Sequence, residues 1–244
     1  MIDKKPGHII PLTISLWCLF VAAAGSFPAY AQKGTDSEIR GKITLTVSQE
    51  SKLRHGGTLE RYPGHGTDSK AATSTTSQPA DTRLSERSVV FLEGDFLNRG
   101  KYPLPEKNPI LDQKGLQFHP QVLPILLGTT VDFPNRDNLF HNVFSYSQPK
   151  EFDLGRYPKD DSRSVRFDRP GIVRVYCDIH SHMNATIMVL QHPYFATPND
   201  DGTYAIRHVP EGKYSIVLWV DRNIVERRPV EVHTGETLTA DFTH

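Results

Sequence analysis

The sequence predicts an all-β protein. Short runs alternate apolar and polar side chains, which is the period of two expected for a half-buried strand. Clusters of Gly, Pro, Asn and Asp separate these runs at regular intervals. Beyond residue 31, helical periodicity is not sustained anywhere. Together these features indicate an antiparallel sandwich or barrel.

The N-terminus has the pattern of a secretory signal peptide. A charged start is followed by an apolar run at 9–25 and by the small-x-small sequence Ala29-Tyr30-Ala31. We expect cleavage after Ala31, so that residues 1–31 are removed and the protein is periplasmic or secreted. Lipid anchoring at Cys18 is a weaker alternative, because large residues precede it. No later apolar run is long enough to span a bilayer.

Charge and cysteine content restrict the function further. The chain has 28 Lys and Arg against 28 Asp and Glu, so we expect neither nucleic acid nor an anionic membrane as a partner. Of the two cysteines, Cys18 lies in the signal peptide, which leaves Cys177 as the only thiol of an exported protein. It cannot form an internal disulfide, so we expect burial or a metal–thiolate bond to protect it.

Two strands are expected near the N-terminus of the mature chain, at 41–47 and 88–93. The segment between them, 48–87, has almost no large apolar residues and is predicted to be a disordered insertion, because little burial offsets the entropy lost on ordering. His55 and His65 lie in this insertion and are expected to be solvated.

The central region, after a Pro- and Gly-punctuated coil at 94–116, is predicted to be a series of short strands. Prolines in the first two argue for edge or bulged strands. The predicted strands are 117–127, 131–135, 141–144, 152–154, 164–167, 171–177 and 185–190.

From His192 onward a second β-rich region begins. Its predicted strands are 203–206, 214–220, 229–232 and 238–242. Some 50 residues make only a thin core, so we expect this region to borrow strands from elsewhere. The candidates are 41–47 and 88–93.

The strand at 171–177 leads into the chemically distinctive loop Cys177-Asp178-Ile179-His180-Ser181-His182-Met183. Cys177, His180 and Met183 are spaced by three residues and offer soft ligands. A blue-copper site requires two His, one Cys and a weak axial Met, so a second histidine must come from elsewhere in the chain.

Three motifs resemble the signature of the cupredoxins, the plastocyanin and amicyanin family: Asn138-x-x-His141-Asn142-Val143, Phe167-x-x-Pro170-Gly171 and Val175-x-Cys177-x-x-His180-x-x-Met183. The Cys-to-Met spacing is similar to the short amicyanin type. Residues 114–195 look more particularly like a bacterial plastocyanin-like, methylamine-utilisation-type group. The resemblance implies a Greek-key sandwich.

The same resemblance implies one bound copper that cycles between Cu(I) and Cu(II), with ligands His141, Cys177, His180 and axial Met183. The implied function is single-electron transfer between periplasmic partners, with a cytochrome or a dehydrogenase as the redox partner, and not enzymatic catalysis. It also implies that Asn142 braces the Cys loop, that Phe140 and Phe144 keep the site dry, and that His180 is the electron exit.

The C-terminal region resembles a carboxypeptidase-regulatory-like, or transthyretin-like, β-sandwich through Asp201-Gly-Thr-Tyr204 and Val209 to Tyr214. The expected organisation is a cupredoxin domain at 96–191 inserted in a small sandwich made of 38–95 and 192–244.

Several alternatives remain open at this stage. Cys177 can be a buried small apolar residue or half of a catalytic Cys–His dyad, and Met183 can be core filler. Zinc would need Asp178 or His182 in place of the methionine, whereas a CuA centre would need a second thiol. His182 is otherwise a surface imidazole. The other histidines with no visible partner are His119, His192, His208 and His233. Copper storage or delivery, and a non-redox binding module, are the alternative functions.

Overall fold

The computed structural model describes residues 36–45, 83–96 and 102–243. The predicted signal peptide at 1–31 and most of the predicted insertion lie outside these residues. The described part of the chain is all-β, as predicted, except for the single helical turn α2 (Leu84–Arg87). The predicted end of the insertion at residue 87 is therefore wrong. Within the described residues, no helix has the length and apolar character needed to cross a membrane.

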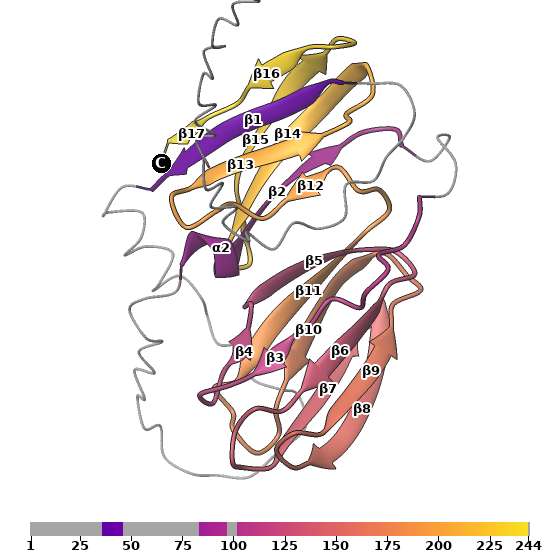
Figure 1. Ribbon diagram of the computed structural model, residues 1–244, viewed down its shortest axis with the longest axis vertical. Coiled ribbons are helices and arrows are strands. Elements are labelled where there is room, and N and C mark those ends of the chain that lie inside the picture. The colour runs from indigo at the N-terminus through magenta and orange to yellow at the C-terminus, as the bar shows by residue number, and fades with distance from the viewer. Residues whose placement is uncertain (1–35, 46–82, 97–101, 244) are drawn as a thin grey trace, which may run out of the picture.

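The first group of strands, which we call the site unit, forms the lower half of Figure 1. Its main sheet has the order β5-β11-β10-β7-β8, and two smaller sheets pair β6 with β9 and β3 with β4. Strand β5 contains Pro124 and lies at the edge of its sheet, which confirms the expectation drawn from its proline. The strands are β3 (Asp112–Gln113), β4 (Phe118–His119), β5 (Val122–Leu126), β6 (Thr130–Pro134), β7 (His141–Ser147), β8 (Lys150–Tyr157), β9 (Ser162–Arg166), β10 (Gly171–Tyr176) and β11 (Asn184–Leu190).

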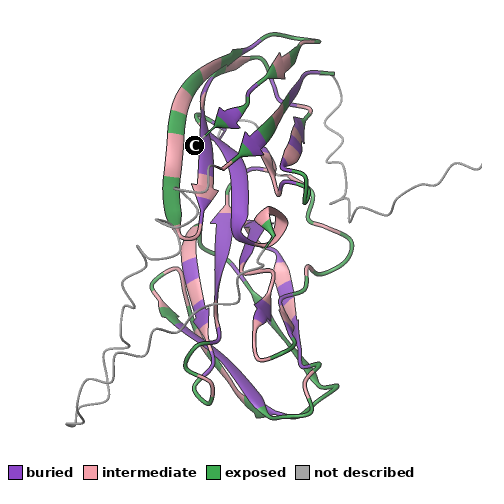
Figure 2. Cartoon of the chain, turned by 90° about the vertical axis from the view of Figure 1, so that its left-hand side faces the viewer, coloured by how far each residue is buried: buried purple, intermediate pink, exposed green. Residues whose placement is uncertain are grey.

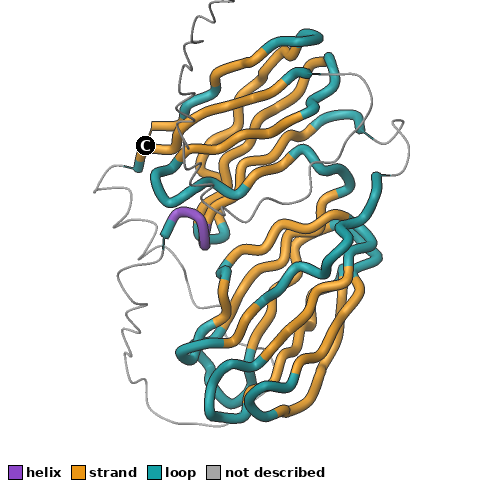
Figure 3. Tube along the Cα trace, viewed as in Figure 1, coloured by secondary structure: helices purple, strands orange, loops and turns teal. Residues whose placement is uncertain are grey.

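The second group, which we call the composite unit, combines strands from both ends of the chain (Figures 1 and 3). Strand β1 lies between β13 and β16, and β2 lies between β12 and β14. The N-terminal strands thus complete the sheets of the C-terminal strands. The strands are β1 (Glu38–Thr44), β2 (Ser88–Glu93), β12 (Phe195–Ala196), β13 (Thr203–Arg207), β14 (Gly212–Val220), β15 (Asn223–Val232), β16 (Thr237–Thr239) and β17 (Phe242–Thr243).

Strand β2 is buried on both faces, which explains its continuous apolar run. Val90 and Leu92 pack in the core of the composite unit. Val89 and Phe91 point the other way and pack against Met188 of the site unit in a separate apolar cluster. This cluster holds the two units together, because its separation would expose buried apolar surface to water. In Figure 2, buried strands run through the middle of the molecule in purple.

The core of the site unit positions the ends of its strands. Val173 and Val175 on β10 are fully buried, and Cys177 continues the same face. Phe133 on β6 and Val165 on β9 pack in the same cluster, so side chains of two sheets meet there. The strand that ends at Cys177 is therefore fixed by packing on both sides.

Candidate metal centre

The loop that carries the predicted ligands joins two hydrogen-bonded strands. Tyr176 and Asn184 form the last pair of β10 and β11. The backbone N–H of Cys177 donates to the carbonyl of Met183 at 3.2 Å, and the N–H of Met183 donates to the carbonyl of His180 at 2.9 Å. These two bonds close the base of the loop and bring His180 back over Cys177.

The structure brings His141, Cys177 and His180 together as a candidate metal-binding group. His141 is the first residue of β7, which lies next to β10 in the main sheet. The two Nδ1 atoms of His141 and His180 are 3.0 Å apart. The Sγ atom of Cys177 lies 3.9 Å from His141 Nδ1 and 3.8 Å from His180 Nδ1.

These separations leave room for one metal ion. A point in the plane of the three atoms lies about 2.1 Å from each of them, close to the ~2.0–2.1 Å of a metal–imidazole bond and slightly below the ~2.3 Å of a zinc–thiolate bond. Two imidazoles and a thiolate in one plane are also the donor set of a trigonal copper site. The residues present therefore fit a bound copper ion.

Asp137 orients the imidazole of His141. Its Oδ2 atom accepts a hydrogen bond from His141 Nε2 at 2.9 Å and another from the backbone N–H of Leu116 at 2.9 Å. A carboxylate can only accept, so the hydrogen-bond network assigns the His141 proton to Nε2 and leaves the lone pair on Nδ1. Burial opposes ionisation of Asp137, but the bonds from Leu116 and His141 outweigh it and lower its pKa.

His180 is partly exposed, whereas His141 is fully buried. Burial lowers the pKa of His180, and the neighbouring imidazoles of His141 and His182 lower it further. His182 itself is exposed and lies outside the group, with its ring centroid 6.4 Å from that of His180. This arrangement agrees with the expectation that His182 is a surface imidazole.

Met183 is 1% exposed and belongs to the same buried cluster as Cys177. Its backbone closes the loop, as described above. Its role as axial ligand stays a prediction.

Asn142 braces the loop, as the resemblance implied. Its Oδ1 atom accepts a hydrogen bond from the backbone N–H of Asp178 at 3.1 Å. Its Nδ2 atom donates to Asp153 on β8 at 2.7 Å, which fixes the orientation of the amide. The loop is thereby tied to β7 and β8.

The predicted shielding role of Phe140 is wrong, because this side chain is 57% exposed. Phe144 is buried, but its ring packs against Tyr146 and Tyr176 and is not part of the core cluster that contains Cys177. The side-chain alternation of β7 accounts for the position of Phe144, since its neighbour Val143 occupies the core face.

Sequence reasoning missed Asp137 and Tyr157. Asp137 precedes His141 by four residues in an Asp- and Asn-rich turn, and this spacing was the available signal. Tyr157 pairs with His141 across β7 and β8, a contact that only the register reveals.

The remaining predicted residues have other partners. Asp178 is exposed and forms an ion pair with Arg156 at 3.2 Å. His119 contacts Glu86 at 2.8 Å, and His192 is buried against the ring of Phe96. Neither Asp178 nor His182 therefore joins the group as the fourth ligand that zinc would need.

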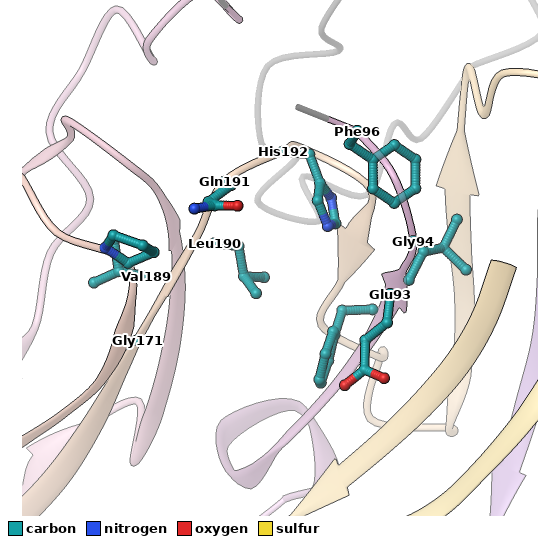
Figure 4. A pocket seen from close by; sticks show the side chains of 11 residues that line it. Glu93, Gly94, Phe96, Gly171, Val189, Leu190, Gln191 and His192 are labelled. Carbon is teal, nitrogen blue, oxygen red and sulfur yellow. The ribbon is translucent and has the colours of Figure 1, made fainter. Parts of the chain in front are cut away.

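A hollow of about 420 Å³ lies at the junction of the two units (Figure 4). It is lined by residues of β2 and by Gly171, at the start of β10. Cys177 follows the other end of β10, so the hollow is about 20 Å from the thiol at ~3.3 Å per residue. Two polar residues of the hollow have partners: Glu93 pairs with Arg227 at 2.8 Å, and His192 accepts the N–H of Tyr194 at 3.2 Å.

Comparisons with known proteins give structural likenesses only. No family model matches the chain, and no curated protein matches it. Among solved structures, a copper-containing nitrite reductase from Thermus scotoductus is 27% identical over 38% of this chain, with a TM-score of 0.34. The match spans 24% of the reductase, about a quarter of its length. Two variants of amicyanin in the Cu(I) form are each 20% identical, with TM-scores of 0.33. They match 34% and 36% of this chain, and 82% and 86% of their own lengths.

Proposed function

We propose that this protein is an exported type 1 copper protein that transfers single electrons. One observation carries the proposal. A single point lies about 2.1 Å from each of three atoms: Sγ of Cys177, Nδ1 of His141 and Nδ1 of His180. In this proposal Met183 is the weak axial ligand. Copper supplies a one-electron couple between Cu(I) and Cu(II) when bound.

The donor set favours copper over zinc. The thiolate of Cys177 and the thioether of Met183 are soft ligands that suit copper, and the two imidazoles bind copper as well as zinc. A structural zinc site would need a fourth Cys, His or carboxylate ligand in place of the thioether. A catalytic Cys–His dyad has less support. Cys177 is 3% exposed, and the hollow in Figure 4 lies at the far end of β10. A nucleophile needs a substrate beside it.

The surroundings of His180 suit electron transfer. Cys177 directly follows β10 and His141 begins β7, and both are buried, which limits movement of the ligands when the charge changes. His180 is the ligand that reaches the surface. The residues next to the ligands in sequence, Phe140 and Ile179, are exposed apolar side chains. They are suited to transient contact with a redox partner, for which we propose a cytochrome or a dehydrogenase.

We also propose the domain organisation expected from the sequence. The cupredoxin domain would span 96–191, and segments 38–95 and 192–244 would together form the second sandwich. The pairing of β1 with β13 and of β2 with β14 supports this division. The proposed location is the periplasm or the exterior, based on the signal-like segment at 1–31.

The test is to add Cu(II) to the purified mature protein and record its visible spectrum. The expected result is an intense absorption band that bleaches with ascorbate. Cys177→Ser should abolish the band while the far-ultraviolet circular dichroism spectrum stays unchanged, and the matched variant His182→Ala should retain the band. Retention of the band in Cys177→Ser would reject the thiolate assignment. A protein that binds Cu(I) but stays colourless with Cu(II) would instead indicate copper storage or delivery.

A further inference from the structure

The turn between β14 and β15 has an unusual residue in an unusual conformation. Val220 pairs with Asn223, so Asp221 and Arg222 alone form the turn. Their φ angles are 46° and 73°, both positive. Two-residue hairpins with this backbone strongly prefer Asn-Gly or Asp-Gly, because a Cβ atom disfavours positive φ. Arginine thus occupies a position where glycine would fold more easily, and strain of this kind often accompanies a function.

The turn is anchored to α2. The backbone N–H of Asp221 donates to the carbonyl of Arg87 at 3.1 Å. The carboxylate of Asp221 lies 3.3 Å from the guanidinium of Arg87, whose side chain is only 6% exposed. Because one residue of the turn is fixed in this way, the position of the next residue, Arg222, is fixed as well.

Arg222 reaches from the composite unit to the metal-binding loop. Its guanidinium donates a hydrogen bond to Oδ1 of Asn184, the first residue of β11. The Nδ2 atom of Asn184 in turn donates to the carbonyl of His182 at 2.9 Å. His182 lies between His180 and Met183, so two hydrogen bonds connect the turn of one unit to the ligand loop of the other.

We propose that Arg222 is a positioning residue for the loop 177–183 and that the composite unit restrains the metal site through it. The restraint on the loop is inferred from the hydrogen bonds alone, whereas its consequence for copper rests on the proposed function. A charged donor fixes the amide of Asn184, and the oriented amide fixes the carbonyl of His182. The loop then holds His180 and Met183 in place relative to Cys177.

Arg222→Gly separates this role from a role in folding. Glycine suits the positive φ of the turn, and this relief of strain offsets the lost hydrogen bond, so the variant should have an unfolding midpoint close to that of the wild type. At the same time it removes the guanidinium. In the metal-free protein, we expect the amide hydrogens of Cys177 and Met183 to exchange about tenfold faster, since a hydrogen bond to a charged group is lost.

Three further variants complete the experiment. Arg227→Ala removes an exposed ion pair on the same hairpin and should leave amide exchange in the loop unchanged. Arg222→Lys retains a cationic donor and should restore part of the protection. Asn184→Ala breaks the relay at its centre and should accelerate exchange as Arg222→Gly does.

In the copper-loaded protein, Arg222→Gly should release copper to a chelator about tenfold faster and shift the visible band, and Arg227→Ala should do neither. The proposal is overturned if Arg222→Gly leaves the exchange of both amides at the wild-type rate. If the wild type binds no copper, the proposed function fails, but the exchange measurement in the metal-free protein still decides the role of Arg222.

Discussion

Asn142 accepts a hydrogen bond from the backbone N–H of Asp178 at 3.1 Å, so the residue after His141 is tied to the residue after Cys177. The two proposed ligands, His141 and Cys177, are 36 residues apart in the chain. This bond fixes the start of the ligand loop to β7, and the donation from Asn142 to Asp153 extends the restraint to β8.

Replacing Asn142 should therefore loosen the metal site without unfolding the protein. In Asn142→Ala the N–H of Asp178 loses its acceptor, and the loop can move away from His141. We expect the affinity for copper to fall roughly 10- to 100-fold, the range typical when residues that support metal ligands are removed, and copper to dissociate correspondingly faster. The measurement is transfer of copper to a chelator, followed by visible absorption. Asn199→Ala, which alters an amide in a turn of the composite unit, is the matched control and should release copper at the wild-type rate.

Asp137→Asn should weaken copper binding by a similar factor. Both carboxylate oxygens of Asp137 accept hydrogen bonds. Oδ1 accepts from the backbone N–H of Gly115, and Oδ2 accepts from the backbone N–H of Leu116 and from His141 Nε2. Asparagine has only one such oxygen, so it must present its NH2 group to one side. If that group faces His141, the imidazole proton moves to Nδ1 and blocks the lone pair that would bind the metal.

The affinity of Asp137→Asn is measured by competition with a Cu(I) chelator at pH 7. Asp178→Asn is the control, since this carboxylate is close to the site but exposed and paired with Arg156. Equal affinities of wild type and Asp137→Asn would contradict the role given to Asp137.

Most strands could be predicted from the sequence because they arise from patterns of neighbouring residues. The alternation in β10 and the turn residues around it are visible in the sequence, and both contribute to the strand wherever it lies. The same holds for the spacing of Cys177 and His180 on one loop. The approach of His141 was available only through a resemblance, since no local pattern shows which strand lies beside β10.

What could not be predicted depends on register and on contacts between distant segments. Phe140 is apolar and precedes the proposed ligand His141, yet the turn before β7 leaves it exposed. Arg222 lies in a turn whose sequence gives no sign of a partner, and its contact with Asn184 exists only because the two units pack together.

Tyr157→Phe should lower the free energy of unfolding by about 1–2 kcal/mol, because its buried hydroxyl group makes two hydrogen bonds. It donates to the carbonyl of Phe133 at 2.9 Å and accepts from Gln113 at 2.7 Å. Burial also raises the pKa of this phenol, so it stays protonated throughout the neutral range. Urea denaturation measures the change. Tyr146→Phe, at a ring that is 60% exposed, should stay within about 0.5 kcal/mol of the wild type.

His192 should make the protein less stable in mild acid. Burial lowers the pKa of this imidazole to about 4, and the rings of Phe96 and Tyr194 pack against it. In the unfolded chain its pKa is about 6.5, so between these values the unfolded state binds the extra proton. The contribution of His192 to the free energy of unfolding is therefore fully present above about pH 6.5. It is lost as the pH is lowered to about 4, a total of about 3 kcal/mol at 1.36 kcal/mol per pKa unit.

His192→Gln removes the titration and should flatten this part of the stability curve. Carboxylates also titrate between pH 4 and 6.5, so the quantity to compare is the difference in unfolding free energy between wild type and variant at pH 7 and at pH 4.5. At pH 7 the variant should be the less stable, because a packed ring is lost; at pH 4.5 this difference should shrink or reverse. His233→Gln, at an exposed histidine of the same unit, is the control. A gap between wild type and His192→Gln that does not change with pH would show that folding does not lower the pKa of His192.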